Sequence, residues 1–355
     1  MSLVMQTANQ SNSEFKLKSE LEGRIQHLAY FYNSNHDIIK LISELLEKMP
    51  DKSVDIIVYT HTDPQRPQTE IKKEDYEPIL KFQKVKKIVG LNEKLNFVYL
   101  DPLPNQNVSI MRYFSRNIIF ALQNEEKYLI IQSNQYINTC FFGTSDKEII
   151  FNKVAKALAK APFKNVTKKH INNPLNKYNN ADLLITKTHA FAYANIPKET
   201  ADHLKNEGFE LVKINLEDKY KYKFYDLDTL ITMYSDNELF ISKGAPRKLK
   251  KDLEKQDIIT SNYPLFKYTN SKNKEEELIG DINVIMEEKN NKKVVYIPKR
   301  TYLLSGPDTE NYLEYLENLK TLWKKKGFNP IEIECDVKPY VGLRCILQSL
   351  QRTIE

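Results

Sequence analysis

The chain has few of the residues from which disulfide frameworks and cofactor sites are built. Three of its 355 residues are cysteines, Cys140, Cys335 and Cys345. They are too few for a disulfide framework, which indicates a reducing compartment. No cysteine and histidine spacing is typical of zinc, and neither a Gly-rich dinucleotide fingerprint nor a phosphate-binding loop is present. We therefore expect no metal and no cofactor.

Long apolar runs are also missing. No stretch approaches the ~18 apolar residues of a membrane span, and the polar segment 1–21 contains no apolar signal-peptide core. A net charge of +6 over 355 residues is far from the dense basic patch of a nucleic-acid-binding domain. We expect a cytoplasmic, soluble protein that binds neither a membrane nor nucleic acid. The sequence leaves the oligomeric state open, a homodimer included.

Two basic segments have a second interpretation. Residues 213–223, which include Tyr220 and Tyr222, and residues 243–255 could form a surface for nucleic acid or for an acidic partner. A solvated, lysine-rich helix face explains both segments more simply.

Short apolar strands alternate with amphipathic helices along most of the chain. We expect residues 1–22 to be a mobile tail and residues 23–355 to form one α/β domain. In the second half, an order of strand, strand, helix and strand recurs. This spacing suits an α/β protein assembled from similar modules. Helices are expected at residues 37–46, 146–161, 197–206, 245–255 and 309–326.

The C-terminal region holds the best candidate for a nucleophile. Cys345 follows Gly342 and sits beside Arg344. The thiolate is the reactive form of cysteine, and a neighbouring cation lowers the pKa of a thiol. Gly342 would let the backbone turn sharply enough to present the sulfur. Because a lone cysteine is more often an inert buried residue, this interpretation depends on the rest of the chain.

Two carboxyl groups form a second candidate. Asp226 and Asp228 lie two residues apart at the start of an expected strand, 229–234. Alternate residues of a strand point to the same side, so the pair could clasp a cation, or one acid could keep the other protonated. A solvated strand entrance is the structural alternative.

Both candidates lie in segments that resemble a known superfamily. Residues 226–233 (DLDTLITM) resemble the HLDTVFTM segment of arginine deiminases, and residues 342–345 (GLRC) resemble their catalytic-cysteine segment. The same pattern occurs in agmatine deiminases, peptidylarginine deiminases, dimethylargininases and amidinotransferases. Together these enzymes form the guanidino-modifying, or pentein, superfamily. Weaker matches begin at Ser115, Asn179 and Asn283, and the resemblance covers roughly residues 53–352.

The resemblance implies a fold and a mechanism. The fold is a five-bladed α/β propeller, in which ββαβ modules with pseudo-fivefold symmetry surround a central site. In the mechanism, a cysteine thiolate attacks the guanidinium carbon and forms a covalent thiouronium, while two acids hold the guanidinium nitrogens. A histidine protonates the leaving amine and then activates water. The expected partner is a small guanidino compound or an arginine side chain.

The superfamily's roles map onto this chain with two departures. Cys345 matches the nucleophile and Asp228 matches an acid, but Asp226 stands in the place of the histidine and Asn117 in that of a guanidinium-binding aspartate. An aspartate with an ordinary pKa of about 3.9 is a poor acid at neutral pH unless burial or another carboxylate raises it. Asn117 can bind a guanidinium, but without charge. The resemblance adds further substrate-binding candidates, namely Arg116, Asn180, Asn283 and Arg344.

Two functions follow from these residues. The first is a cysteine-dependent, deiminase-like hydrolase, preferred over an amidinotransferase because the two segments are closer to the deiminase pattern. The second is a catalytically silent protein of the same fold that binds a ligand or a partner, as Asp226 and Asn117 would suggest. A reaction of the aspartate pair on an uncharged substrate is a third alternative. His189 follows an expected strand and could approach the site, although a packing or surface role explains it more simply.

Overall fold

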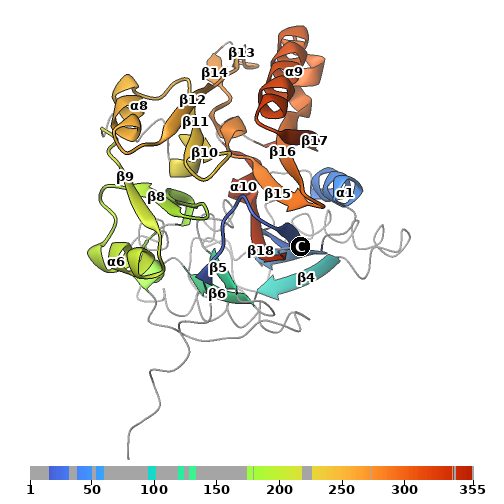
Figure 1. Ribbon diagram of the computed structural model, residues 1–355. Helices are drawn as coiled ribbons and strands as arrows, with labels where there is room; N and C mark the ends of the chain where they lie inside the picture. The colour runs from blue at the N-terminus through green and yellow to red at the C-terminus, as the bar shows by residue number, and fades with distance from the viewer. Residues whose placement is uncertain are drawn as a thin grey trace, which may run out of the picture.

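The computed structural model describes twelve stretches of the chain, and all structural statements below refer to them. They are residues 16–31, 38–49, 53–59, 95–100, 119–123, 128–132, 174–178, 180–217, 226–272, 274–337, 339 and 341–353. The described chain is a mixed α/β structure of small sheets and helices. The longer helices α1, α6, α8 and α9 lie on the outside of the ribbon, and the short helix α10 lies near its middle (Figure 1).

Three sheets share one plan, an antiparallel strand pair followed by a helix and a third strand parallel to the second. The first contains β7 (Leu183–Ile185), β8 (His189–Tyr193), α6 (Lys198–Asn206) and β9 (Glu210–Ile214). The second contains β10 (Ile231–Met233), β11 (Glu238–Ser242), α8 (Arg247–Glu254) and β12 (Ile259–Tyr263). The third contains β15 (Ile285–Lys289), β16 (Lys292–Arg300), α9 (Thr309–Lys325) and β17 (Phe328–Cys335).

Segments from opposite ends of the sequence form a fourth sheet on the same plan. Strand β18 (Leu347–Thr353) runs antiparallel to β2 (Arg24–Phe31), and β2 continues through α1 (Ile38–Lys48) to the parallel strand β3 (Ser53–Tyr59). Strand β4 (Leu95–Leu100) is added parallel to β3. The pairing of β18 with β2 therefore joins the two ends of the described chain within one sheet.

The remaining strands form two smaller groups. Strands β1 (Lys16–Leu17), β5 (Ile119–Gln123) and β6 (Tyr128–Gln132) form an antiparallel sheet. Strands β13 (Lys267–Thr269) and β14 (Glu275–Glu277) form a hairpin.

A short helical turn precedes the first strand of each of the four repeated sheets. These turns are η4 (Asn180–Asp182), η5 (Leu227–Thr229), η6 (Ile279–Ile282) and α10 (Leu343–Ile346). Two further 3₁₀ turns are η3 (Pro174–Lys177) and η7 (Thr301–Ser305). Turn η5 packs against both η4 and η6. The entrances to neighbouring sheets therefore lie together, which is where the candidate site is found.

Apolar periodicity explains why these segments take these forms. In β8, Phe191 and Tyr193 belong to one buried cluster and Ala190 and Ala192 to another, as expected for side chains that alternate across a strand. Helix α9 buries one apolar stripe at a spacing of three and four residues, made of Tyr312, Tyr315, Leu316, Leu319 and Trp323. Trp323 is fully buried, as a core residue should be.

The expected helices 37–46, 197–206, 245–255 and 309–326 correspond to α1, α6, α8 and α9. The expected helix 146–161 lies outside the described residues. Part of the expected tail is described, and residues 16–22 belong to the folded chain, because β1 pairs with β5 and the Glu20 amide donates to the Ile185 carbonyl over 3.0 Å. In the described part of the chain, no helix combines the length and the apolar character needed to cross a membrane.

Candidate active site

The thiol of Cys345 lies against the amide of Asn283. Cys345 is in α10 and Asn283 directly follows η6, and the Asn283 Nδ2 donates a hydrogen bond to the Cys345 Sγ over 3.0 Å. Asn283 is 0% exposed and Cys345 is 2% exposed. A hydrogen bond is stronger when its acceptor is ionised, so this contact favours the thiolate over the thiol.

Two glycines allow the two backbone segments to approach this closely. A Cβ on Gly342 would lie 2.5 Å from the Asn283 Cβ and would also meet the Gly280 carbonyl, and a Cβ on Gly280 would lie 2.5 Å from the Val341 carbonyl carbon. The backbone of Gly342 is extended, with φ −103° and ψ 176°. The chain does turn after Gly342, as the sequence predicted, but the glycine supplies space for the close approach and adopts no unusual backbone angle.

Backbone hydrogen bonds hold the same two segments together. The Gly280 amide donates to the Pro339 carbonyl over 2.9 Å, and the Arg344 amide donates to the Asn283 carbonyl over 3.4 Å. The Cys345 amide closes a turn onto the Gly342 carbonyl at 3.2 Å. The thiol and its amide donor are thus placed by main-chain contacts on both sides.

A buried ion pair lies beside these segments. Asp281 and Arg300 are both 0% exposed, and the Asp281 Oδ1 accepts from Arg300 Nε over 3.0 Å and from Arg300 Nη2 over 2.5 Å. Arg300 also donates from Nη1 to the Val337 carbonyl and from Nη2 to the Val341 carbonyl, each over 2.8 Å. Burial alone would lower the pKa of Arg300, but the Asp281 carboxylate outweighs it and raises that pKa. Arg300 therefore stays cationic.

The predicted acids lie in the next turn. Asp226 is the residue that precedes η5 and Asp228 lies within it, and they are 8% and 0% exposed. The Asp182 Oδ1 accepts from the Leu227 amide over 3.1 Å, and the Thr229 Oγ1 donates to the Asp226 carbonyl over 2.8 Å. The expected solvated strand entrance is wrong. The residues are buried, and they form a 3₁₀ turn in which the period of two does not apply.

A tyrosine that the sequence patterns did not single out lies near these acids. Burial, and then the carboxylates of Asp182 and Asp226, raise the pKa of Tyr193 well above its ordinary value. Its hydroxyl is buried and has no hydrogen-bond partner within the described ranges. Tyr193 thus remains a protonated donor near Asp182 and Asp226.

The other predicted residues divide into three groups. Asn180 is buried in η4, the turn that η5 contacts. Arg344 is 5% exposed, and its Nη2 forms an ion pair with the Glu20 carboxylate, so binding a substrate carboxylate would require it to exchange partners. Arg116 and Asn117 lie outside the described residues.

His189 begins β8 and contacts Thr188 and Glu210. Its Nδ1 lies 2.8 Å from the Thr188 Oγ1, and its Nε2 lies 3.6 Å from the Glu210 Oε2. The packing and surface role that the sequence favoured agrees with these contacts. Among the residues that the structure describes, no group of three or more histidine, cysteine or acidic side chains could hold a metal ion.

Of the other two cysteines, the structure describes only Cys335. Cys335 is 1% exposed, and burial raises the pKa of its thiol to about 12. A thiol with so high a pKa is a poor nucleophile at neutral pH, in agreement with the structural role expected for it. Cys140 lies outside the described residues.

The sequence matches no protein-family model and no curated protein. Solved structures nevertheless share its fold. A candidate agmatine deiminase superposes with a TM-score of 0.58 at 9% identity, with 96% of each chain covered. An agmatine deiminase of Enterococcus faecalis gives 0.57 at 7% identity, covering 96% of this chain and 97% of that one. A candidate peptidyl-arginine deiminase gives 0.56 at 11% identity, covering 97% and 99%. The resemblance to the guanidino-modifying superfamily is thus confirmed at the level of the fold.

Proposed function

We propose that the chain is a cysteine-dependent hydrolase of guanidino groups, with Cys345 as its nucleophile. The observation that carries this proposal is the 3.0 Å hydrogen bond from the Asn283 Nδ2 to the Cys345 Sγ. A thiol held by an amide donor, near a turn with two buried carboxyl groups, has the parts needed to attack a cationic carbon. The fold shared with deiminases supports the same reaction class.

We also propose the full architecture that the superfamily would require, a five-bladed propeller of ββαβ modules. The four sheets of common plan support it, because each contributes an antiparallel pair, a helix and a parallel strand. The antiparallel pair of β5 and β6 would begin the fifth module. The arrangement of helices outside and α10 near the middle is compatible with this design (Figure 1).

The proposed reaction has two steps. The Cys345 thiolate attacks the guanidinium carbon, one carbon–nitrogen bond breaks, and ammonia or an amine leaves with a proton, so that a thiouronium remains on the sulfur. Water then attacks the same carbon, the carbon–sulfur bond breaks, and a ureido product is released with the thiolate restored. Asp228 holds a guanidinium nitrogen by a charge-assisted hydrogen bond. Asp226 moves the proton that the superfamily's histidine would move, with Tyr193 beside it.

The proposed substrate is a small guanidino compound or an arginine side chain. A cationic, planar guanidinium offers several N–H donors, which suit the carboxylates of Asp226 and Asp228 and the amide oxygens of Asn117 and Asn180. Arg116 is the remaining candidate for a substrate carboxylate, since Arg344 is engaged with Glu20.

One specific observation favours a second function, a silent protein that binds a guanidino ligand without turning it over. Asp226, buried to 8% exposure, stands where the superfamily's histidine is expected. A carboxyl group with an ordinary pKa donates protons poorly at neutral pH. If neither its burial nor Tyr193 compensates, the site would hold the guanidinium and stop before the leaving amine departs.

The test is ureido and ammonia formation from arginine, agmatine, methylated arginines and arginine peptides, from about pH 5 to about pH 9. Mass spectrometry of the quenched protein would look for the thiouronium adduct. We expect Cys345→Ala to abolish turnover and adduct. We expect Cys335→Ala, which removes a similarly buried cysteine, to retain both, because that thiol has a pKa of about 12.

The two functions predict different results. Turnover that survives Cys345→Ala would refute the cysteine mechanism. Absence of turnover and adduct across the panel, combined with saturable binding of one guanidino compound in calorimetry, would support the silent protein instead.

A further inference from the structure

We propose that the ion pair of Asp281 and Arg300 is the positioning device of the cysteine site, by which Arg300 holds the segment that carries Cys345 against the segment that carries Asn283. The inference rests on the proposed function, because a positioned thiolate matters only if Cys345 reacts. Its geometry and its test concern the thiol alone and require no substrate.

Arg300 is the point at which three segments meet. It is the last residue of β16, and its guanidinium donates to Asp281 in η6 over 3.0 and 2.5 Å. The same guanidinium donates to the Val337 and Val341 carbonyls over 2.8 Å each. One buried side chain therefore fixes the distance between η6 and the segment that leads into α10.

The path from this ion pair to the sulfur is short. Asp281 lies two residues before Asn283, and Val341 lies four residues before Cys345. The Tyr263 hydroxyl donates to the Asp281 carbonyl over 2.9 Å, which fixes the other side of the turn. A displacement of the pair would therefore be transmitted directly to the Asn283–Cys345 contact.

The choice of arginine agrees with a geometric role. Its planar guanidinium presents several donors in a fixed fork, whereas lysine presents a single point charge. A buried ion pair adds little net stability over well-packed apolar residues, because taking both charges out of water is costly. The Arg300 guanidinium instead fixes relative positions, because its hydrogen bonds hold one carboxylate and two carbonyl groups at once.

The test measures thiolate ultraviolet absorbance against pH, as the difference between each protein and the same protein carrying Cys345→Ala. The positioning variants are Arg300→Lys and Asp281→Asn. Asn283→Asp serves as the reference, because it replaces the amide donor with an acceptor. Tyr312→Phe is the matched control. It removes the acceptor of the Arg300 main-chain amide at 2.6 Å but leaves every guanidinium contact in place.

We expect both positioning variants to lower the thiolate fraction at neutral pH about tenfold, the order of effect of losing a hydrogen bond to a charged group. Asn283→Asp should lower it at least as much. Tyr312→Phe should lower the melting temperature and leave the thiolate titration unchanged. A purely structural role of the ion pair predicts instead that Arg300→Lys and Asp281→Asn behave in the same way as this control. If Arg300→Lys fails to fold, Asp281→Asn decides the matter.

Two results would overturn the inference. In the first, the positioning variants leave the thiolate titration as it is while Asn283→Asp shifts it, so that the pair is only structural. In the second, Asn283→Asp also has no effect, so that the amide does not control the thiol. A normal response of the thiolate in a protein that turns over no guanidino compound would instead count against the proposed function and leave this inference standing.

Discussion

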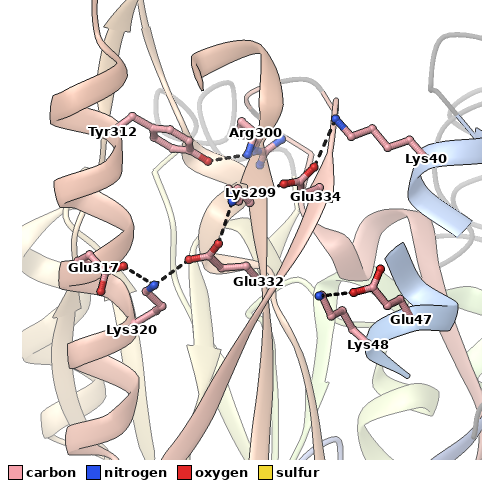
Figure 2. A network of polar contacts seen from close by, with 10 residues as sticks. All are labelled: Lys40, Glu47, Lys48, Lys299, Arg300, Tyr312, Glu317, Lys320, Glu332 and Glu334. Atoms are coloured by element: carbon pink, nitrogen blue, oxygen red, sulfur yellow. Dashed lines mark hydrogen bonds and ion pairs between the residues drawn. The ribbon is translucent and has the colours of Figure 1, made fainter. Parts of the chain in front are cut away.

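Two neighbouring residues of β16, Lys299 and Arg300, carry the same charge into opposite environments (Figure 2). The Lys299 Nζ lies 3.3 Å from Glu332 and 3.4 Å from Glu334, and its side chain is 22% exposed. Arg300 points to the other side of the strand and is fully buried against Asp281. Because side chains alternate across a strand, β16 has partly exposed ion pairs on one face and the buried Asp281–Arg300 pair on the other.

The half-exposed set is here called the surface network. It joins α1, α9, β16 and β17 (Figure 2). It consists of Lys40, Lys299, Glu317, Lys320, Glu332 and Glu334.

The two sets differ in what water does to them. Charges near the surface are screened, and exposed ion pairs contribute about 1 kcal/mol or less each. A charge that loses its partner in the interior stays uncompensated, which costs several kcal/mol. The surface network should therefore tolerate the loss of one residue at a time, whereas the loss of either Asp281 or Arg300 leaves the other charge buried without its partner. The candidate site lies beside the buried Asp281–Arg300 pair, where the loss of one charge is costly.

Truncating each of the two neighbouring side chains should show the largest difference between the two sets of ion pairs. We expect Arg300→Ala to lower the free energy of unfolding by about 3–5 kcal/mol, because it leaves the Asp281 carboxylate buried without its partner. Lys299→Ala should cost about 1 kcal/mol or less. Urea unfolding of both variants measures the difference. Equal losses would show that burial does not separate the two ion-pair sets.

Helices with a clear apolar stripe could be predicted from the sequence, whereas short turns could not. The apolar stripe of α9 predicted a helix over 309–326, and the structure has it at Thr309–Lys325. Such patterns work because period and burial are local properties of a segment. The same local logic failed at Asp226 and Asp228, where η5 replaces the start of the expected strand 229–234. A strand and a 3₁₀ turn of three residues differ too little in composition for the pattern to separate them.

The site was predicted in part. Cys345 was singled out by its neighbours Gly342 and Arg344, and Asn283 through the resemblance, but the contact between the two depends on tertiary packing that no spacing predicts. Asp281 follows Leu278, Ile279 and Gly280, and Arg300 follows Lys299, so nothing in their local sequence indicates that they form a buried pair. Glu20 lies in the segment that was expected to be a mobile tail, so its ion pair with Arg344 could not be predicted from the sequence.

A smaller effect is expected in the interior when space and not charge is changed. We expect Gly342→Ala to destabilise the fold by about 1–3 kcal/mol, the usual cost of overpacking a filled interior. Its Cβ would meet Asn283 and the Gly280 carbonyl, which are backbone or β-carbon atoms that cannot swing away. Gly306→Ala is the matched control, because nothing lies within 4 Å of the added Cβ. Thermal unfolding of both variants would test this, and equal melting temperatures would contradict it.

The smallest effect tests the surface side through its pH dependence. Burial alone would raise the pKa of Glu332, but Lys320 and Lys299 outweigh it and hold that pKa below its ordinary value of 4.5. A carboxyl group whose pKa is lowered by folding stabilises the protein above that ordinary value, and the stabilisation is lost as the pH falls below it.

Near neutral pH, the free energy of unfolding of the unmodified protein should therefore be roughly 0.5–1 kcal/mol larger than that of Glu332→Gln. This excess should vanish at about pH 3. Because the ion pairs of Glu332 with Lys299 and Lys320 are partly exposed, about 0.5 M salt should also reduce the excess at neutral pH. The loss caused by Arg300→Ala, measured in the same buffers, should respond little to salt, since buried charges are poorly screened. An excess that survives both acid and salt would mean that Glu332 stabilises the fold by packing and not by charge, and the contrast between the two faces of β16 would then be one of burial alone.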